Sequence, residues 1–100
     1  MANLTIARTI QQQLYAFGQI KVMSWGANTW VGGDNFLMFK VQAYRHTGWV
    51  KIELNGSDLY DITLLDERKK VVKTFNNIYF DEMTDVIDKE IEYIPEYKNN

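Results

Sequence analysis

Residues 36–54 read FLMFKVQAYRHTGWVKIEL, and apolar and polar side chains alternate along most of this stretch. Successive residues of a strand point to opposite sides of a sheet, so alternation with a period of two predicts β-structure. We expect strands at 36–44 and 49–54, joined by a turn at 45–48 that ends in glycine. One face of the resulting sheet should form the core.

The alternation continues outward on both sides of this pair. The Gly32-Gly33-Asp34-Asn35 segment is the strongest turn signal in the chain, because glycine tolerates the positive φ angles of tight hairpins. Short spacings between strands favour antiparallel pairing, since parallel strands need long crossovers. We therefore expect an antiparallel meander of about five strands within residues 19–75. The remaining segments are a strand at 19–25, a turn at 26–28, a short apolar piece at 29–31, a turn at 55–58, and a hairpin of 59–65 and 70–75 around 66–69.

Two segments outside the strands show helical periodicity instead. Apolar residues recur three or four positions apart within about 4–17 and within about 80–93, which predicts two amphipathic helices. Gly18 ends the first helix and Pro95 ends the second, leaving a tail at 95–100. The sequence therefore predicts one α+β domain spanning residues 1–100, with both helices on one face of the sheet.

Composition narrows the class of protein. The chain has 46% hydrophobic residues, no cysteine and a net charge of −2, so we expect a folded protein without disulfides or thiolate metal sites. The charge is uneven, because residues 1–80 are mildly basic and residues 81–100 are acidic. No stretch resembles a signal peptide or a membrane span, so we expect a cytoplasmic protein that does not contact a membrane.

The sequence contains no recognisable catalytic constellation. His46 is the only histidine and lies in a turn, and neither Ser24 nor Ser57 occupies a nucleophile-elbow motif. Asp58 and Asp61 could act as acids or bases if burial raised a carboxyl pKa. Structural roles, as a turn cap and as a hydrogen-bond acceptor, are favoured for both. We expect a protein that is not an enzyme, with no catalytic residue, no metal and no cofactor.

The second sheet face is expected to be aromatic and basic, which is unusual for a merely solvated surface. Trp and Tyr are enriched in protein interfaces and supply much of the binding energy there. Stacking aromatics beside lysines also suit single-stranded nucleic acid or a nucleotide ligand, and aromatics can pack in a homodimer. We favour a protein partner over these alternatives. The candidate binding residues are Trp25, Trp30, Tyr44, Trp49, Lys21, Lys40 and Lys51.

Acidic side chains gather on the second predicted helix. A solvated helix face is the ordinary interpretation. The alternative is that these carboxylates mimic phosphates and occupy a nucleic-acid groove on a target protein. The residues concerned are Asp81, Glu82, Asp85, Asp88 and Glu92.

Several short strings resemble a family of small proteins of unknown activity that bacteriophages and related mobile elements encode. They are GANTWV at 26–31, NFLMFK at 35–40, VKIEL at 50–54, DLYD at 58–61, VKT at 72–74 and YFD at 79–81. The likeness covers about residues 20–90 in order, with Trp25 as a departure from the smaller polar residue that many such proteins have there. The resemblance implies a phage-type accessory protein in the bacterial cytoplasm. Together with the absence of a catalytic constellation, the aromatic surface and the charged helix, it leads us to expect a protein that binds and inhibits a host factor, for example a defence or replication enzyme. The resemblance assigns no role to any single residue.

Overall fold

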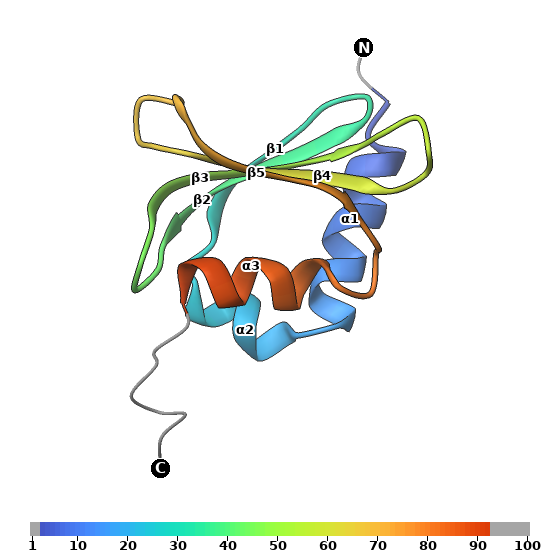
Figure 1. The fold of residues 1–100 in the computed structure, drawn as a ribbon. Helices are drawn as coiled ribbons and strands as arrows, with labels where there is room; N and C mark the ends of the chain where they lie inside the picture. The colour runs from blue at the N-terminus through green and yellow to red at the C-terminus, as the bar shows by residue number, and fades with distance from the viewer. Residues whose placement is uncertain (1–2, 93–100) are drawn as a thin grey trace.

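Five strands follow one another across a single antiparallel sheet in the order of the sequence. Three helices cover one face of this sheet and leave the other uncovered (Figure 1). The computed structural model describes residues 3–92. The strands are β1 (Asn28–Gly32), β2 (Phe36–Gln42), β3 (Thr47–Leu54), β4 (Tyr60–Leu65) and β5 (Val71–Ile78), and the helices are α1 (Thr5–Ala16), α2 (Gln19–Ser24) and α3 (Met83–Ile91). The expected α+β meander between an N-terminal and a C-terminal helix is confirmed.

The central hairpin has the register that its alternation predicts. Seven consecutive pairs join β2 to β3, from Phe36 opposite Glu53 to Gln42 opposite Thr47. The odd-numbered residues of β2, Leu37, Phe39 and Val41, are buried under the helices. Even-numbered residues of β2 therefore point to the uncovered face.

The prediction of a strand at 19–25 is wrong, because this segment forms the short helix α2. Val22 and Trp25 are both fully buried, and three residues of helix bring them to the same side. In a strand they would point to opposite faces. The alternation of the expected strand would place Ile20 in the core with Val22, but Ile20 is 83% exposed on the outer side of α2. Seven residues are too few to distinguish the strand period of two from the helix period of 3.6, so packing against the core determines which structure forms.

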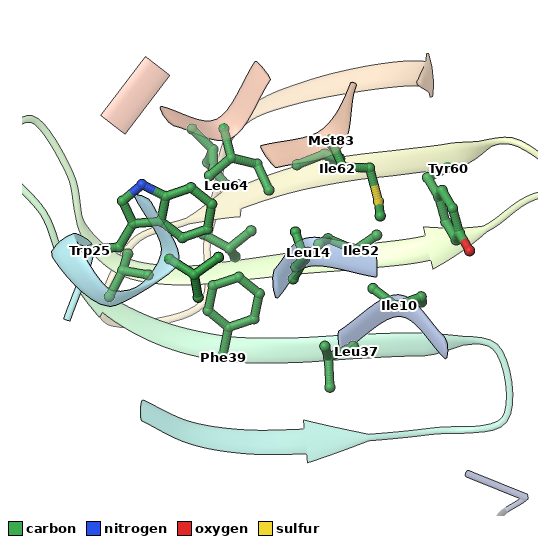
Figure 2. Packing of buried hydrophobic residues seen from close by; sticks show 14 of the residues in the cluster. Ile10, Leu14, Trp25, Leu37, Phe39, Ile52, Tyr60, Ile62, Leu64 and Met83 are labelled. Atoms are coloured by element: carbon green, nitrogen blue, oxygen red, sulfur yellow. The ribbon is translucent and has the colours of Figure 1, made fainter. Parts of the chain in front are cut away.

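The core lies between the covered face of the sheet and the helices (Figure 2). Ile10 and Leu14 of α1 lie over the middle of the sheet, near Leu37 and Ile52. The Trp25 ring lies nearly parallel to that of Phe39, with centroids 6.3 Å apart. Aromatic and branched side chains from both layers thus fill one continuous interior.

The buried Tyr60 hydroxyl lies at one border of this core and donates a hydrogen bond of 2.8 Å to Gln13 Oε1. Burial raises the pKa of Tyr60 more than this hydrogen bond lowers it. The hydrogen bond satisfies a polar group that would otherwise be costly to bury. It ties α1 to β4.

Helix α3 closes the core from the C-terminal side. Met83, Ile87 and Ile91 are fully buried at the expected helical spacing, and Thr84 Oγ1 donates to the Leu14 carbonyl at 2.9 Å. The helix begins at Met83, later than expected, because residues 79–82 form a turn in which Glu82 N–H donates to the Tyr79 carbonyl. Residue 93 and the expected tail at 95–100 lie outside the described residues.

Candidate protein-binding surface

The sheet face opposite the helices is the surface on which part of the predicted site comes together. Lys40 pairs with Trp49 across β2 and β3, and Met38 pairs with Lys51 two positions away. Cross-strand partners project side by side from the same face. We call the following residues the open face: Val31, Phe36, Met38, Lys40, Trp49, Lys51, Glu53, Asp61, Thr63, Leu65 and, from the β4–β5 turn, Lys69.

Trp49 lies on the central strand β3, beside Lys40 at one end of the open face and outside the main core cluster. The Nζ atoms of Lys40 and Lys69 lie 5.6 Å and 4.8 Å from the centroid of its ring system. Leu65 is its partner on β4. These neighbours leave Trp49 only 8% exposed. A cation over an indole face is attracted by the ring quadrupole, so the lysines form a charged cover over the tryptophan.

A second ring on the open face has the same kind of cover. Lys51 Nζ lies 4.8 Å from the centroid of the Phe36 ring. Over these two rings the open face presents ammonium groups. Such groups attract carboxylates and other anions over a distance set by salt screening. The two carboxylates of the open face lie at its Phe36 end, where Glu53 accepts a hydrogen bond from Asn35. Asp61 accepts from Asn55 and Asn77.

A pocket of about 180 Å³ adjoins the Lys40 end of the open face. Its walls include Asn28, Gln42, Thr47 and Glu67. Polar groups of both donor and acceptor type are thus available beside the lysine. They could orient a side chain that reaches in from a partner.

Lys69 is the member of the open face that the sequence patterns do not reveal. It lies in the β4–β5 turn, outside any strand phase, and it has a positive φ of 66°. Asp66 fixes this turn by accepting hydrogen bonds from the backbone N–H groups of Arg68 and Lys70, at 2.8 and 2.9 Å. These hydrogen bonds hold the pKa of the Asp66 carboxyl below its usual value. Turns with an acidic residue followed by basic residues are common, so this sequence does not predict the contact of Lys69 with Trp49.

Trp25 does not belong to this surface, contrary to the prediction. It is fully buried in the core, and its Nε1–H donates to Asp88 Oδ1 at 3.0 Å. The helical geometry of α2 turns it inward, toward Phe39. It anchors α2 and α3 to each other and has no surface left to offer a partner.

Three other predicted binding residues are also away from the open face. Trp30 is half-buried on the helical side, with its ring centroid 4.6 Å from that of Phe39. Tyr44 is 63% exposed, but in the β2–β3 turn at the end of the sheet. Lys21 forms an ion pair with Asp85 on α3. The hydrogen bond from its ammonium group to the Asp85 carboxylate raises the Lys21 pKa.

The acidic residues of α3 are largely engaged in holding the fold together. Asp85 pairs with Lys21, and Asp88 accepts from the Trp25 indole. Glu92 Oε2 accepts from the Tyr44 backbone N–H at 3.0 Å. Asp81 and Glu82 are exposed beside the N-terminal end of the helix. Asp85, Asp88 and Glu92 therefore each have a partner within the fold, and the phosphate-mimic interpretation stays a prediction.

Two of the remaining candidates for chemistry, Asp61 and His46, have structural partners. Asp61 Oδ1 accepts from Asn55 Nδ2 and from the Asn77 backbone N–H, both at 3.1 Å. His46 Nε2 lies 3.4 Å from the Trp49 carbonyl oxygen. Within residues 3–92, no three potential metal ligands of the His, Cys, Asp or Glu type cluster together. The same part of the chain contains no helix that is both long and apolar enough to span a bilayer.

No family model, no curated protein and no solved structure matches this chain. The resemblance to phage-encoded proteins therefore stays a prediction. No residue role can be carried over from a relative, and the candidate surface depends on its own geometry.

Proposed function

We propose that this chain is a non-enzymatic binding protein that uses the open face to engage an acidic surface on another protein. One observation carries the proposal: three lysines lie over two aromatic rings on the only sheet face that the described helices leave uncovered. A carboxylate-bearing partner can pair with the ammonium groups and contact the apolar stems and rings beside them.

The same observation favours a protein over single-stranded nucleic acid. Nucleic-acid bases bind to sheets by stacking on exposed aromatic faces. Here the accessible sides of Trp49 and Phe36 have lysines over them, and Trp49 is only 8% exposed. A base would have to displace a favourable cation before it could stack, whereas a carboxylate would not.

The sequence resemblance directs the search for a partner to bacteria. If the chain is a phage-type accessory protein, its partner is a host factor in the bacterial cytoplasm, and binding would inhibit that factor. A defence or replication enzyme with an acidic nucleic-acid-mimicking or regulatory surface would fit the charge of the open face. This assignment depends on the resemblance, while the surface itself does not.

Charge reversal tests the proposal. We would compare the wild-type chain with Lys40→Glu/Lys69→Glu in affinity capture from bacterial lysate, followed by titration of each captured protein in purified form. Arg8→Glu/Lys89→Glu is the matched control, because it makes the same change in charge at exposed helical positions. The proposal requires a partner that the first variant loses and the control retains, with affinity falling as salt rises.

Two results would overturn this proposal. One is that every captured protein binds both variants equally, which would leave the open face without a role. The other is that oligothymidine of about 20 nucleotides binds the wild type and loses affinity in Lys40→Glu/Lys69→Glu. In that case the ligand is single-stranded nucleic acid.

A further inference from the structure

A second uncovered surface lies on the outer side of the helical layer. Ile20 and Met23 are 83% and 65% exposed on α2, and three residues of helix place them on the same side. Phe17 and Phe80 are 44% and 48% exposed near the start of that helix, with ring centroids 5.6 Å apart in an edge-to-face arrangement. We call these four residues the outer ridge.

The outer ridge is held in place by the fold and is not a loose segment. On the inner side of α2, Val22 and Trp25 are fully buried. Gly18 lies so close to α3 that a Cβ atom there would come within 2.5 Å of Thr84 Cγ2. The Lys21–Asp85 ion pair adds a further link between the two helices. The apolar side chains are therefore presented outward on a fixed support.

Acidic groups border the outer ridge. Asp81 and Glu82 directly follow Phe80 and are exposed. Lys21, the basic residue of α2, is already paired with Asp85. The border of the ridge thus carries net negative charge, in contrast to the ammonium groups of the open face.

We propose that the outer ridge is a second binding surface, and that its occupant is an amphipathic helical segment of another protein with lysine or arginine beside its apolar side. Exposed apolar patches with charged borders are typical of protein interaction sites. The apolar face of an amphipathic helix can pack along the exposed side of α2 as one helix packs on another, and basic residues next to it would meet Asp81 and Glu82. Charge also argues against a second copy of the chain, because a symmetric contact would bring acid against acid.

A pair of synthetic peptides of about 18 residues tests this proposal. Both have leucine along one helical face, and the polar face is lysine in one and glutamate in the other. Because the open face itself would attract a glutamate-rich peptide, the comparison is made in Lys40→Glu/Lys69→Glu. We expect this variant to bind the Leu/Lys peptide at least about tenfold more tightly than the Leu/Glu peptide, as measured by fluorescence anisotropy. Asp81→Asn/Glu82→Gln should reduce the ratio of the two peptide affinities, because it removes the acidic charges that the lysines would meet.

The decisive variant is Ile20→Ser/Met23→Ser, which should weaken Leu/Lys binding by about tenfold or more. Its matched control is Val71→Ser/Val72→Ser, because these β5 residues are 66% and 59% exposed and belong to the sheet layer, whereas α2 belongs to the helical layer (Figure 1). The control should stay within about twofold of the wild type. Thermal unfolding of each variant verifies that the fold is retained.

Three outcomes would overturn the proposal. The full-length protein could fail to bind the Leu/Lys peptide, or the Ile20/Met23 and Val71/Val72 variants could bind it equally well. Alternatively, sedimentation could show a dimer of the chain that Ile20→Ser/Met23→Ser dissociates, so that a second copy occupies the ridge. None of these outcomes bears on the open face, whose test depends on Lys40 and Lys69.

Discussion

Residues 19–25 and β3 have similar patterns of apolar and polar residues but form different secondary structure. Each segment alternates apolar and polar residues, and each contains one tryptophan and one lysine. The first forms α2 and sends Trp25 into the core, whereas the second forms a central strand and places Trp49 on the open face. The comparison teaches that a short alternating pattern permits a strand, but neighbouring elements decide whether one forms.

The two tryptophans also have chemically opposite partners. The edge of the Trp25 indole donates its N–H to a carboxylate, that of Asp88, within the helical layer. The face of the Trp49 indole receives the ammonium groups of Lys40 and Lys69. Trp25 therefore links elements inside the fold, whereas Trp49 lies beneath the charged groups of the open face.

The largest effect should come from Trp25→Ala. We expect a loss of about 3–5 kcal/mol in the free energy of unfolding, because the change leaves a cavity between α2 and Phe39. Urea denaturation measures this loss. Trp25→Phe is the control that keeps most of the volume and removes the hydrogen bond to Asp88. A loss below about 1 kcal/mol for Trp25→Ala would mean that Trp25 does not anchor the core.

A smaller effect is expected for Trp49→Ala, about 1–2 kcal/mol in the free energy of unfolding. The change removes cross-strand and cation–π contacts, but water can enter the open face, so no empty cavity remains. The same urea experiment applies. A loss as large as that of Trp25→Ala would show that Trp49 contributes to the core as much as Trp25 does, which would contradict its assignment to a binding surface.

The smallest effect concerns the ion pair that links α2 to α3. The hydrogen bond to Asp85 raises the pKa of Lys21 above its ordinary value of 10.5. The stabilisation is therefore fully present below about pH 10.5 and is lost as pH rises through the folded-state pKa. Because both side chains are about half exposed, Lys21→Met should cost less than about 1 kcal/mol.

Unfolding at about pH 8 and about pH 11 checks this prediction. The difference in stability between wild type and Lys21→Met should be present at the lower pH and shrink at the higher one. Lys89→Met, on the same helical layer, is the control for general loss of positive charge. An equal difference at both pH values would show that the Lys21 charge does not contribute.

Long periodic segments made most of the fold predictable from the sequence. The pattern of β2 and β3 predicts the central hairpin and its faces, and the spacing of Met83, Ile87 and Ile91 predicts the buried side of α3. The segment 19–25 fails because its pattern is shorter than two helical turns. In such a segment, tertiary packing outweighs local preference.

The candidate surface was predictable only in part, for the same reason. Lys40, Trp49 and Lys51 belong to strands whose phase is clear, and they do share the open face. The sequence pattern places Trp25 and Lys21 on that face only if residues 19–25 form a strand, and they form α2 instead. Lys69 comes from a turn, so its contact with Trp49 depends on the turn conformation that Asp66 fixes.

The hydrogen bond from Thr84 to the Leu14 carbonyl joins residues 70 positions apart in the chain. Every strand pair, by contrast, joins strands that are consecutive in the sequence. Local contacts form fastest, because closing a long loop costs more chain entropy. The hairpins can therefore assemble early, whereas the helical layer closes only when the two ends of the chain meet. We therefore expect the docking of α3 against α1 to follow the pairing of the strands, because it alone requires the two ends of the chain to meet.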